Sequence, residues 1–175
     1  MGRAAVRSAI QSCLQGAQIP YLGTVWPARP VITDEDSYTQ TMSGQAIAES
    51  PSGSACIAVV NLPSDRRVRR ADVGRGAVDD TNVHDVALEL FFASSGGNAA
   101  PQGIEAQQDY DSIVDALTVA IRANPTPEGI WSVGEFTAGV THEQSTPFQS
   151  EDGMTVLIAG LLRFEAWEWV SGVGV

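Results

Sequence analysis

The sequence has little of what chemical sites and crosslinked folds are usually built from. It contains no lysine, two histidines and two cysteines among its 175 residues. Cys13 and Cys56 occur in no CxxC or framework spacing, which argues against a disulfide scaffold. No apolar run approaches the roughly 18 residues of a membrane span, and the opening residues lack the apolar core of a secretion signal. We expect a chain made in the cytoplasm, with two buried thiols and no membrane segment.

Motifs of catalysis and cofactor binding are also missing. The chain contains no GxGxxG, GxxxxGK[ST], HExxH or GxSxG pattern. His84 falls on the apolar face of a predicted strand, where we expect a hydrogen-bonded structural role, and His142 is expected to form a solvated pair with Glu143. The acidic residues 34–36 have no histidine or cation nearby in the sequence. We therefore predict no catalytic residue, no metal and no cofactor.

The composition is acidic and rich in apolar residues. The formal net charge is -11 at pH 7, with 43% apolar and 18% charged residues. A chain of this length fits one domain that buries roughly 70% of its unfolded surface. The excess of acid argues against broad binding to nucleic-acid phosphates. We expect one globular domain over residues 1–175.

Hydrophobic periodicity predicts the secondary structure. Helical spacing indicates one helix over residues 3–15 and another that begins at Ile104 and ends before Pro125. Strands are predicted at 21–30, 54–61 and 82–94, the last from its alternation of apolar and polar residues. Residues 129–143 and 155–170 are predicted to form a C-terminal antiparallel hairpin. Residues 33–53 are polar and rich in turn formers, and are predicted to be a loop.

These elements predict an α+β fold with a mostly antiparallel or mixed sheet, two helices on one face and a long hairpin arm. The strand at 155–164 is apolar on both faces, although a sheet covered by helices on one side usually carries polar residues on the other. A large core would explain this pattern, but a subunit interface accounts better for both faces. Trp167 and Trp169 near the end of this strand are candidate interface residues.

One basic segment interrupts the acidic chain. Residues 66–75 hold five of the ten cationic side chains, namely Arg66, Arg67, Arg69, Arg70 and Arg75. They lie between two predicted strands, so residues 64–81 are predicted to be a basic hairpin or loop arm. The segment is interpreted in three ways: a solvated loop, a weak DNA contact, or an arm that docks on an acidic protein surface through arginine–carboxylate pairs. The docking arm and the solvated loop both fit the sequence better than the DNA contact.

The order of elements resembles one family. A helix with the sequence VRSAIQSCLQGA is followed by LGTVWPARP, a strand pair with a long polar connection, the helix YDSIVDALTVAIRANP and the closing strand VLIAGLLRFEAWEWV. This pattern is similar to the tail terminator (tail-completion) proteins of long-tailed bacteriophages. The resemblance implies a non-enzymatic virion protein at the head-proximal end of the tail. It implies a six-membered ring that caps the tail tube, ends its polymerisation and meets the head connector or stopper, while DNA passes through the lumen without specific binding.

Two alternatives stay open. A second structural role in the same setting is a head-completion or stopper protein, or a subunit of the tail tube. A role of a different class is a small enzyme or ligand-binding module with a carboxylate site, for which Asp34 and Glu35 are the candidates.

Overall fold

The computed structural model describes residues 2–32, 35–50, 53–71, 78–95, 102–123, 132–133, 139–150 and 153–170. Three helices are present in this part: α1 (Arg3–Gly16), α2 (Glu35–Glu49) and α3 (Gln102–Ala123). Its strands are β1 (Leu22–Trp26), β2 (Ser54–Ala71), β3 (Val78–Ser95), β4 (Ser132–Val133), β5 (Thr141–Gln144), β6 (Phe148–Gln149) and β7 (Thr155–Val170). The predicted α+β class is confirmed.

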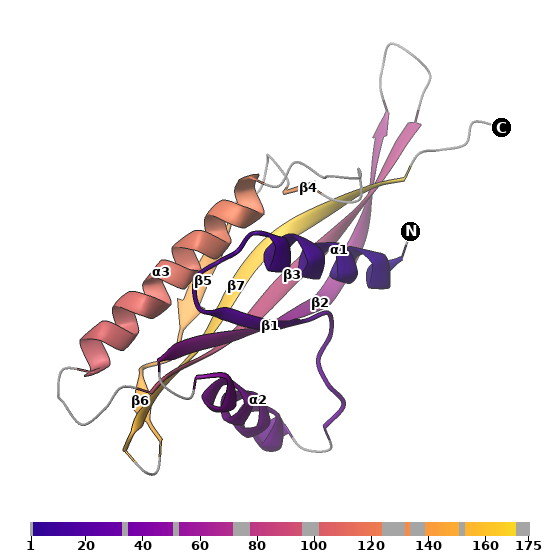
Figure 1. The fold of residues 1–175 in the computed structure, drawn as a ribbon. Helices are drawn as coiled ribbons and strands as arrows, with labels where there is room; N and C mark the ends of the chain where they lie inside the picture. Colours follow the sequence, from indigo (N-terminus) through magenta and orange to yellow (C-terminus); the bar gives the residue numbers. More distant parts are fainter. Residues whose placement is uncertain are drawn as a thin grey trace.

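All strands belong to one mixed sheet with the order β1-β2-β3-β7-β4, and β5 and β6 also pair with β7. Among the strands that the structure describes, only the pair of β1 with β2 is parallel; β3 is antiparallel to both β2 and β7 along nearly its whole length. The far ends of β2 and β3 project beyond α1 and α3 (Figure 1). The sheet therefore consists of a body covered by helices and a narrower extension.

One face of the sheet packs against α1 and α3, as predicted for two helices on one face. The helical spacing of the apolar residues explains this, because Val6, Ile10 and Leu14 of α1 fall on one side and are buried. The stripe on α3 behaves in the same way, and the strands contribute their alternate residues. The core on this face includes Tyr110, Ile113, Leu117, Ile121, Cys56, Ala58, Leu88, Leu90, Phe92, Ile158 and Leu162.

The opposite face is covered in its central part by α2, and this corrects two expectations. The segment 33–53 was expected to be a loop, yet most of it is helical. Tyr38, Met42 and Ala46 follow each other at four-residue intervals and pack, with Ile47, against the strands. The strand residues beneath them are Ile57, Val59, Phe91, Ala93 and Leu157. The apolar second face is therefore a second core layer within the chain, where a subunit interface had been the better explanation.

The C-terminal region differs in part from the predicted hairpin. The strand predicted at 155–170 is confirmed as β7, a central strand between β3 and a discontinuous edge. Within the described residues of 129–143, the edge consists of β4 and β5, two and four residues long. These are pieces of an edge and not one long strand. Residues 129–131 and 134–138 lie outside the described part of the chain.

Candidate functional site

The segment singled out by its charge forms the outer part of a long β-hairpin. We define the hairpin arm as residues 64–71 of β2 and residues 78–85 of β3. The first half of β2 is apolar and buried, whereas residues 63–67 are all exposed. The change coincides with a register shift between Asn61 and Ser64, where three residues of β2 span the length of two in β3. The basic residues thus continue a strand that begins in the core. The turn residues 72–77, which include Arg75, lie outside the described part.

The register places aspartates opposite two of the four arginines of the arm. Arg69 lies opposite Asp80, and Arg70 lies opposite Asp79. Residues 64–71 contain four arginines and one aspartate, and residues 78–85 contain three aspartates. The arm as a whole therefore carries little net charge. All four arginines lie on the outer strand, and three of the four carboxylates lie on the inner strand.

Arg66 is held within the chain. Its guanidinium donates to Glu165 at 2.6 Å and to Asp85 at 3.4 Å, and the Asp85 carboxylate also accepts a hydrogen bond from Ser64. The hydrogen bond to Glu165 is the main reason why the pKa of Arg66 is raised. Because the Arg66 side chain is half exposed, these pairs add little stability, about 1 kcal/mol or less. Their effect is to orient the strand and its guanidinium.

The other predicted interface residues are distributed along the arm and the end of β7. Arg67 is exposed, in register with Asn82. Trp167 is only 9% exposed, and its indole N–H donates to Glu165 at 3.2 Å. Trp169 lies in register with Thr81 of β3. The structure thus brings Arg66 of β2 and Trp167 of β7 together around Glu165.

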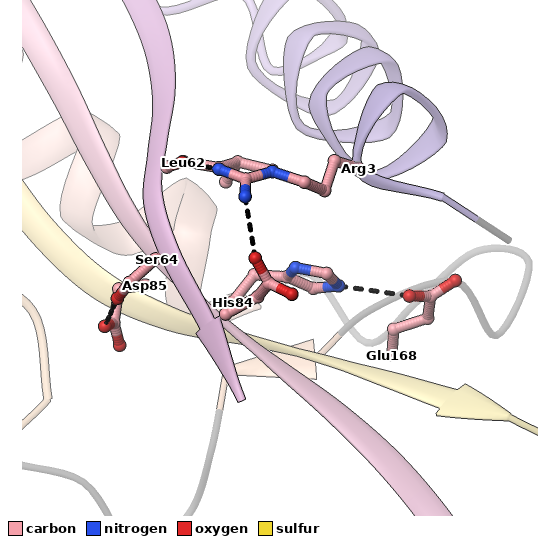
Figure 2. A network of polar contacts seen from close by, with 7 residues as sticks. Arg3, Leu62, Ser64, His84, Asp85 and Glu168 are labelled. Carbon is pink, nitrogen blue, oxygen red and sulfur yellow. Dashed lines mark hydrogen bonds and ion pairs between the residues drawn. The ribbon is translucent and has the colours of Figure 1, made fainter. Parts of the chain in front are cut away.

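Polar contacts connect the base of the arm to α1 on the sheet face that α1 and α3 cover (Figure 2). Arg3 reaches from α1 to donate to Asp65 at 2.7 Å and to the backbone carbonyl of Leu62. His84 and Glu168 are both buried, with His84 Nε2 3.0 Å from Glu168 Oε2. This confirms that His84 is hydrogen-bonded, as expected. Burial opposes ionisation of Glu168, but hydrogen bonds, the one from His84 foremost, outweigh it and lower the pKa of Glu168.

A second buried carboxylate, Glu89, was not singled out from the sequence. It lies on the α2 face of β3 and accepts from Arg29 at 2.6 and 2.8 Å, from Tyr38 at 2.6 Å and from Asn61 at 3.3 Å. The Arg29 guanidinium also lies 5.0 Å from the centre of the Tyr38 ring. Burial is the main cause of the raised pKa of Tyr38, and the Glu89 carboxylate adds to it. The cluster fastens α2 and the segment before it to the sheet.

His142 does not pair with Glu143 as predicted. Its Nε2 lies 2.9 Å from the hydroxyl of Tyr110, which comes from α3. The Tyr110 hydroxyl lies directly over Gly160 of β7, where a Cβ atom would overlap it. Gly160 therefore provides the space in which α3, β5 and β7 meet. Glu143 itself is exposed.

The described residues form clefts beside the strands of the sheet, one of them lined by Asp85, Arg163 and Glu165. They contain no group of three or more side chains suited to bind a metal ion, and no helix among them is long and apolar enough to cross a membrane. A cleft of about 330 Å³ opens beside Arg29, Tyr38, Glu89 and Leu161. Its one carboxylate is the engaged Glu89. Glu35 begins α2, and Asp34 lies outside the described part.

Comparison with known proteins adds one distant likeness. No family model matches this sequence, and no curated protein matches it. Among solved structures, a chain of the "Virion of native gene transfer agent (GTA) particle" is 12% identical with a TM-score of 0.36. The match covers 93% of this chain and 94% of that chain. A likeness of this size carries no functional meaning by itself.

Proposed function

We propose that the protein is a structural subunit of a phage-like particle, one that forms a head-to-tail ring at the end of a tail tube. In this role it ends tube polymerisation and joins the tail to the head connector. The observation that carries the proposal is the hairpin arm, which extends the sheet beyond the helices (Figure 1). Residues 63–67 are exposed and contribute nothing to the core, although Asp65 and Arg66 form ion pairs within the chain. The arm therefore offers an exposed surface for contacts outside the subunit.

The outer edge of β2 supports this role. In the described part of the chain, β1 pairs with β2 only as far as Val59, which leaves the edge of residues 63–71 without a neighbouring strand. An edge of this length is a hazard for uncontrolled strand pairing. Here it carries three devices that limit such pairing: Pro63, the bulge beside it and a row of arginines. A long edge guarded in this way suits a contact with one chosen partner.

Charge supports an inert passage for DNA. The net charge is -11, Arg69 and Arg70 of the arm have aspartates in register behind them, and Arg66 donates to Asp85. A ring of such subunits offers few free cations to phosphates, so DNA would pass without being held. The ring partners are further copies of the chain, the tail tube protein and the connector or stopper. Trp167 and Trp169 at the end of β7 are further candidate contacts.

The test is assembly on tail tubes. We expect purified protein, added to polymerising tubes, to cap one end and fix tube length, as seen by negative-stain microscopy. Binding along the whole tube would instead indicate a tube subunit, and binding only to tail-free heads would indicate a stopper. Either result contradicts the terminator role.

The arm has its own test. Replacing Arg66, Arg67, Arg69 and Arg70 with Ser should leave the subunit folded, because exposed ion pairs contribute about 1 kcal/mol or less. Joining of tails to heads should fall. Circular dichroism verifies the fold, and counts of joined particles measure the loss; a normal yield of joined particles would contradict the role given to the arm.

A further inference from the structure

The hairpin arm and the outward face of α3 complement each other in charge and length. Resting on the ring function proposed above, we propose that the basic edge of β2 in one subunit docks on the exposed stripe of α3 in a second copy. The contact pairs arm arginines with Asp111 and Asp115. It makes the ring interface heterologous, with a different surface from each subunit.

The arm cannot serve as its own partner. Two copies of the β2 edge brought together by a two-fold axis would align Arg66, Arg67, Arg69 and Arg70 of one copy with the same residues of the other. Like charges directly opposite each other destabilise a strand pair. A guanidinium has five N–H donors, so an arginine that contacts the carboxylate behind it can still donate to another carboxylate in front. The edge therefore selects an acidic partner and rejects a symmetric dimer.

The outward face of α3 has the required character. Ile104, Asp111, Asp115 and Val119 fall on one exposed stripe at helical spacing. Ile104 and Val119 are 64% and 65% exposed, which is unusual for two aliphatic residues on one helix face. Asp111 and Asp115 lie between them, and in the described part of the chain neither forms an ion pair. An acidic centre flanked by exposed aliphatic side chains resembles a docking surface more than a solvated helix face.

The dimensions of the two surfaces agree. The stripe from Ile104 to Val119 spans about 22 Å along a helix, and residues 64–71 span about 23 Å along a strand. Asp111 and Asp115 are about 6 Å apart along the helix axis. Arg67 and Arg69, two positions apart in β2, are about 7 Å apart. Two arginine–carboxylate pairs can therefore form without bending either element.

A second copy is the occupant because of where the two surfaces lie. The arm is on the outer edge of β2, whereas α3 contacts β7 and β5 through Tyr110 near Gly160 and through Gln107 hydrogen-bonded to Gln144. In Figure 1 the arm projects away from the body and from α3 of the same chain. A subunit that has unlike, complementary surfaces at two places joins head to tail, and such contacts close into a ring.

A charge exchange tests the contact. Two variants reverse one side each, Arg67→Glu with Arg69→Glu and Asp111→Arg with Asp115→Arg. Sedimentation velocity of the full chain should show self-association weakened about tenfold or more in each. The chain that carries all four changes should recover association to within about threefold of wild type, because the same pairs form with reversed polarity. Arg163→Glu, which changes an exposed arginine outside the arm, is the matched control and should associate as wild type does.

The outcomes separate the contact from the proposed function. Reversals that leave association unchanged, a combined variant that stays as weak as the single-sided ones, or a wild-type chain that is monomeric at every concentration each overturn the contact. Capping of tail tubes by a protein that fails this exchange would leave the terminator role intact. Rescue by the exchange in a protein that never caps tubes would support the contact and reject the role.

Discussion

The Glu89 cluster allows one stability prediction to be worked through. Glu89→Gln keeps the shape of the side chain but removes the charge that Arg29 and Tyr38 share. The Tyr38 hydroxyl, 2.6 Å away, loses a charge-assisted hydrogen bond worth about 1.5 kcal/mol. The Arg29 side chain is 49% exposed, so its contribution is screened and is set at about 0.5 kcal/mol. We expect the free energy of unfolding to fall by about 2 kcal/mol.

Urea denaturation followed by tryptophan fluorescence measures this change, and hydrogen exchange locates it. Protection should decrease in α2 more than in α3, because the cluster fastens α2 to the sheet. Tyr38→Phe should cost about 1.5 kcal/mol in the wild-type background and much less when Glu89 is already Gln. The control is Glu143→Gln, an exposed carboxylate, which should change stability by no more than about 0.5 kcal/mol. A Glu89→Gln protein as stable as this control would refute the reasoning.

Three further predictions concern single sites. Gly160→Ala should lower stability by about 1–3 kcal/mol in thermal denaturation, because the added methyl group overlaps the Tyr110 hydroxyl; an unchanged melting temperature would show that α3 can shift. Burial raises the pKa of the Cys56 thiol to about 12, whereas Cys13 is half-buried. Thiol reagents at pH 8 should therefore label Cys13 first and Cys56 only on unfolding. Equal labelling rates of the two thiols would contradict this. Because the pKa of Glu168 is lowered from its ordinary value of 4.5, its ionised form stabilises the fold at pH values above 4.5. The free energy of unfolding should therefore decline as the pH falls below 4.5, and it should decline less steeply in Glu168→Gln. Equal pH dependence of the two proteins in acid would count against the His84 contact.

Elements with strong periodicity were predictable from the sequence. The apolar stripe of α3, the two-residue alternation of β3 and the apolar run of β7 each identified their element, because burial of one face dictates the spacing. The same reasoning failed for α2. Its interior is rich in Ser, Thr and Gly, residues that favour turns, and its helical state depends on packing against the sheet. The recurrence of Tyr38, Met42 and Ala46 was the available signal.

The candidate site was only partly predictable. The Arg-rich segment was recognised, and its place in a hairpin was expected. Which aspartates of β3 balance which arginines becomes visible only once the register is known, since it pairs Arg70 with Asp79 and Arg69 with Asp80, 9 and 11 positions away. Glu89 was not singled out, because its partners come from residues 29, 38 and 61. Long-range contacts of this kind leave no pattern in a single sequence.

The bulge between Asn61 and Ser64 separates two patterns of side-chain alternation in β2. The alternation that serves the core stops there, and a new one begins that decides which arginines share a face with Glu165 and which with α1. Substitutions after Ser64 can therefore change the contacts that the arm makes without disturbing the core. Insertion or deletion of one uncharged residue near Pro63 would leave the charge of the arm unchanged. It would exchange the side chains on the two faces of the arm. A family of such proteins could change partners at this one position by length alone.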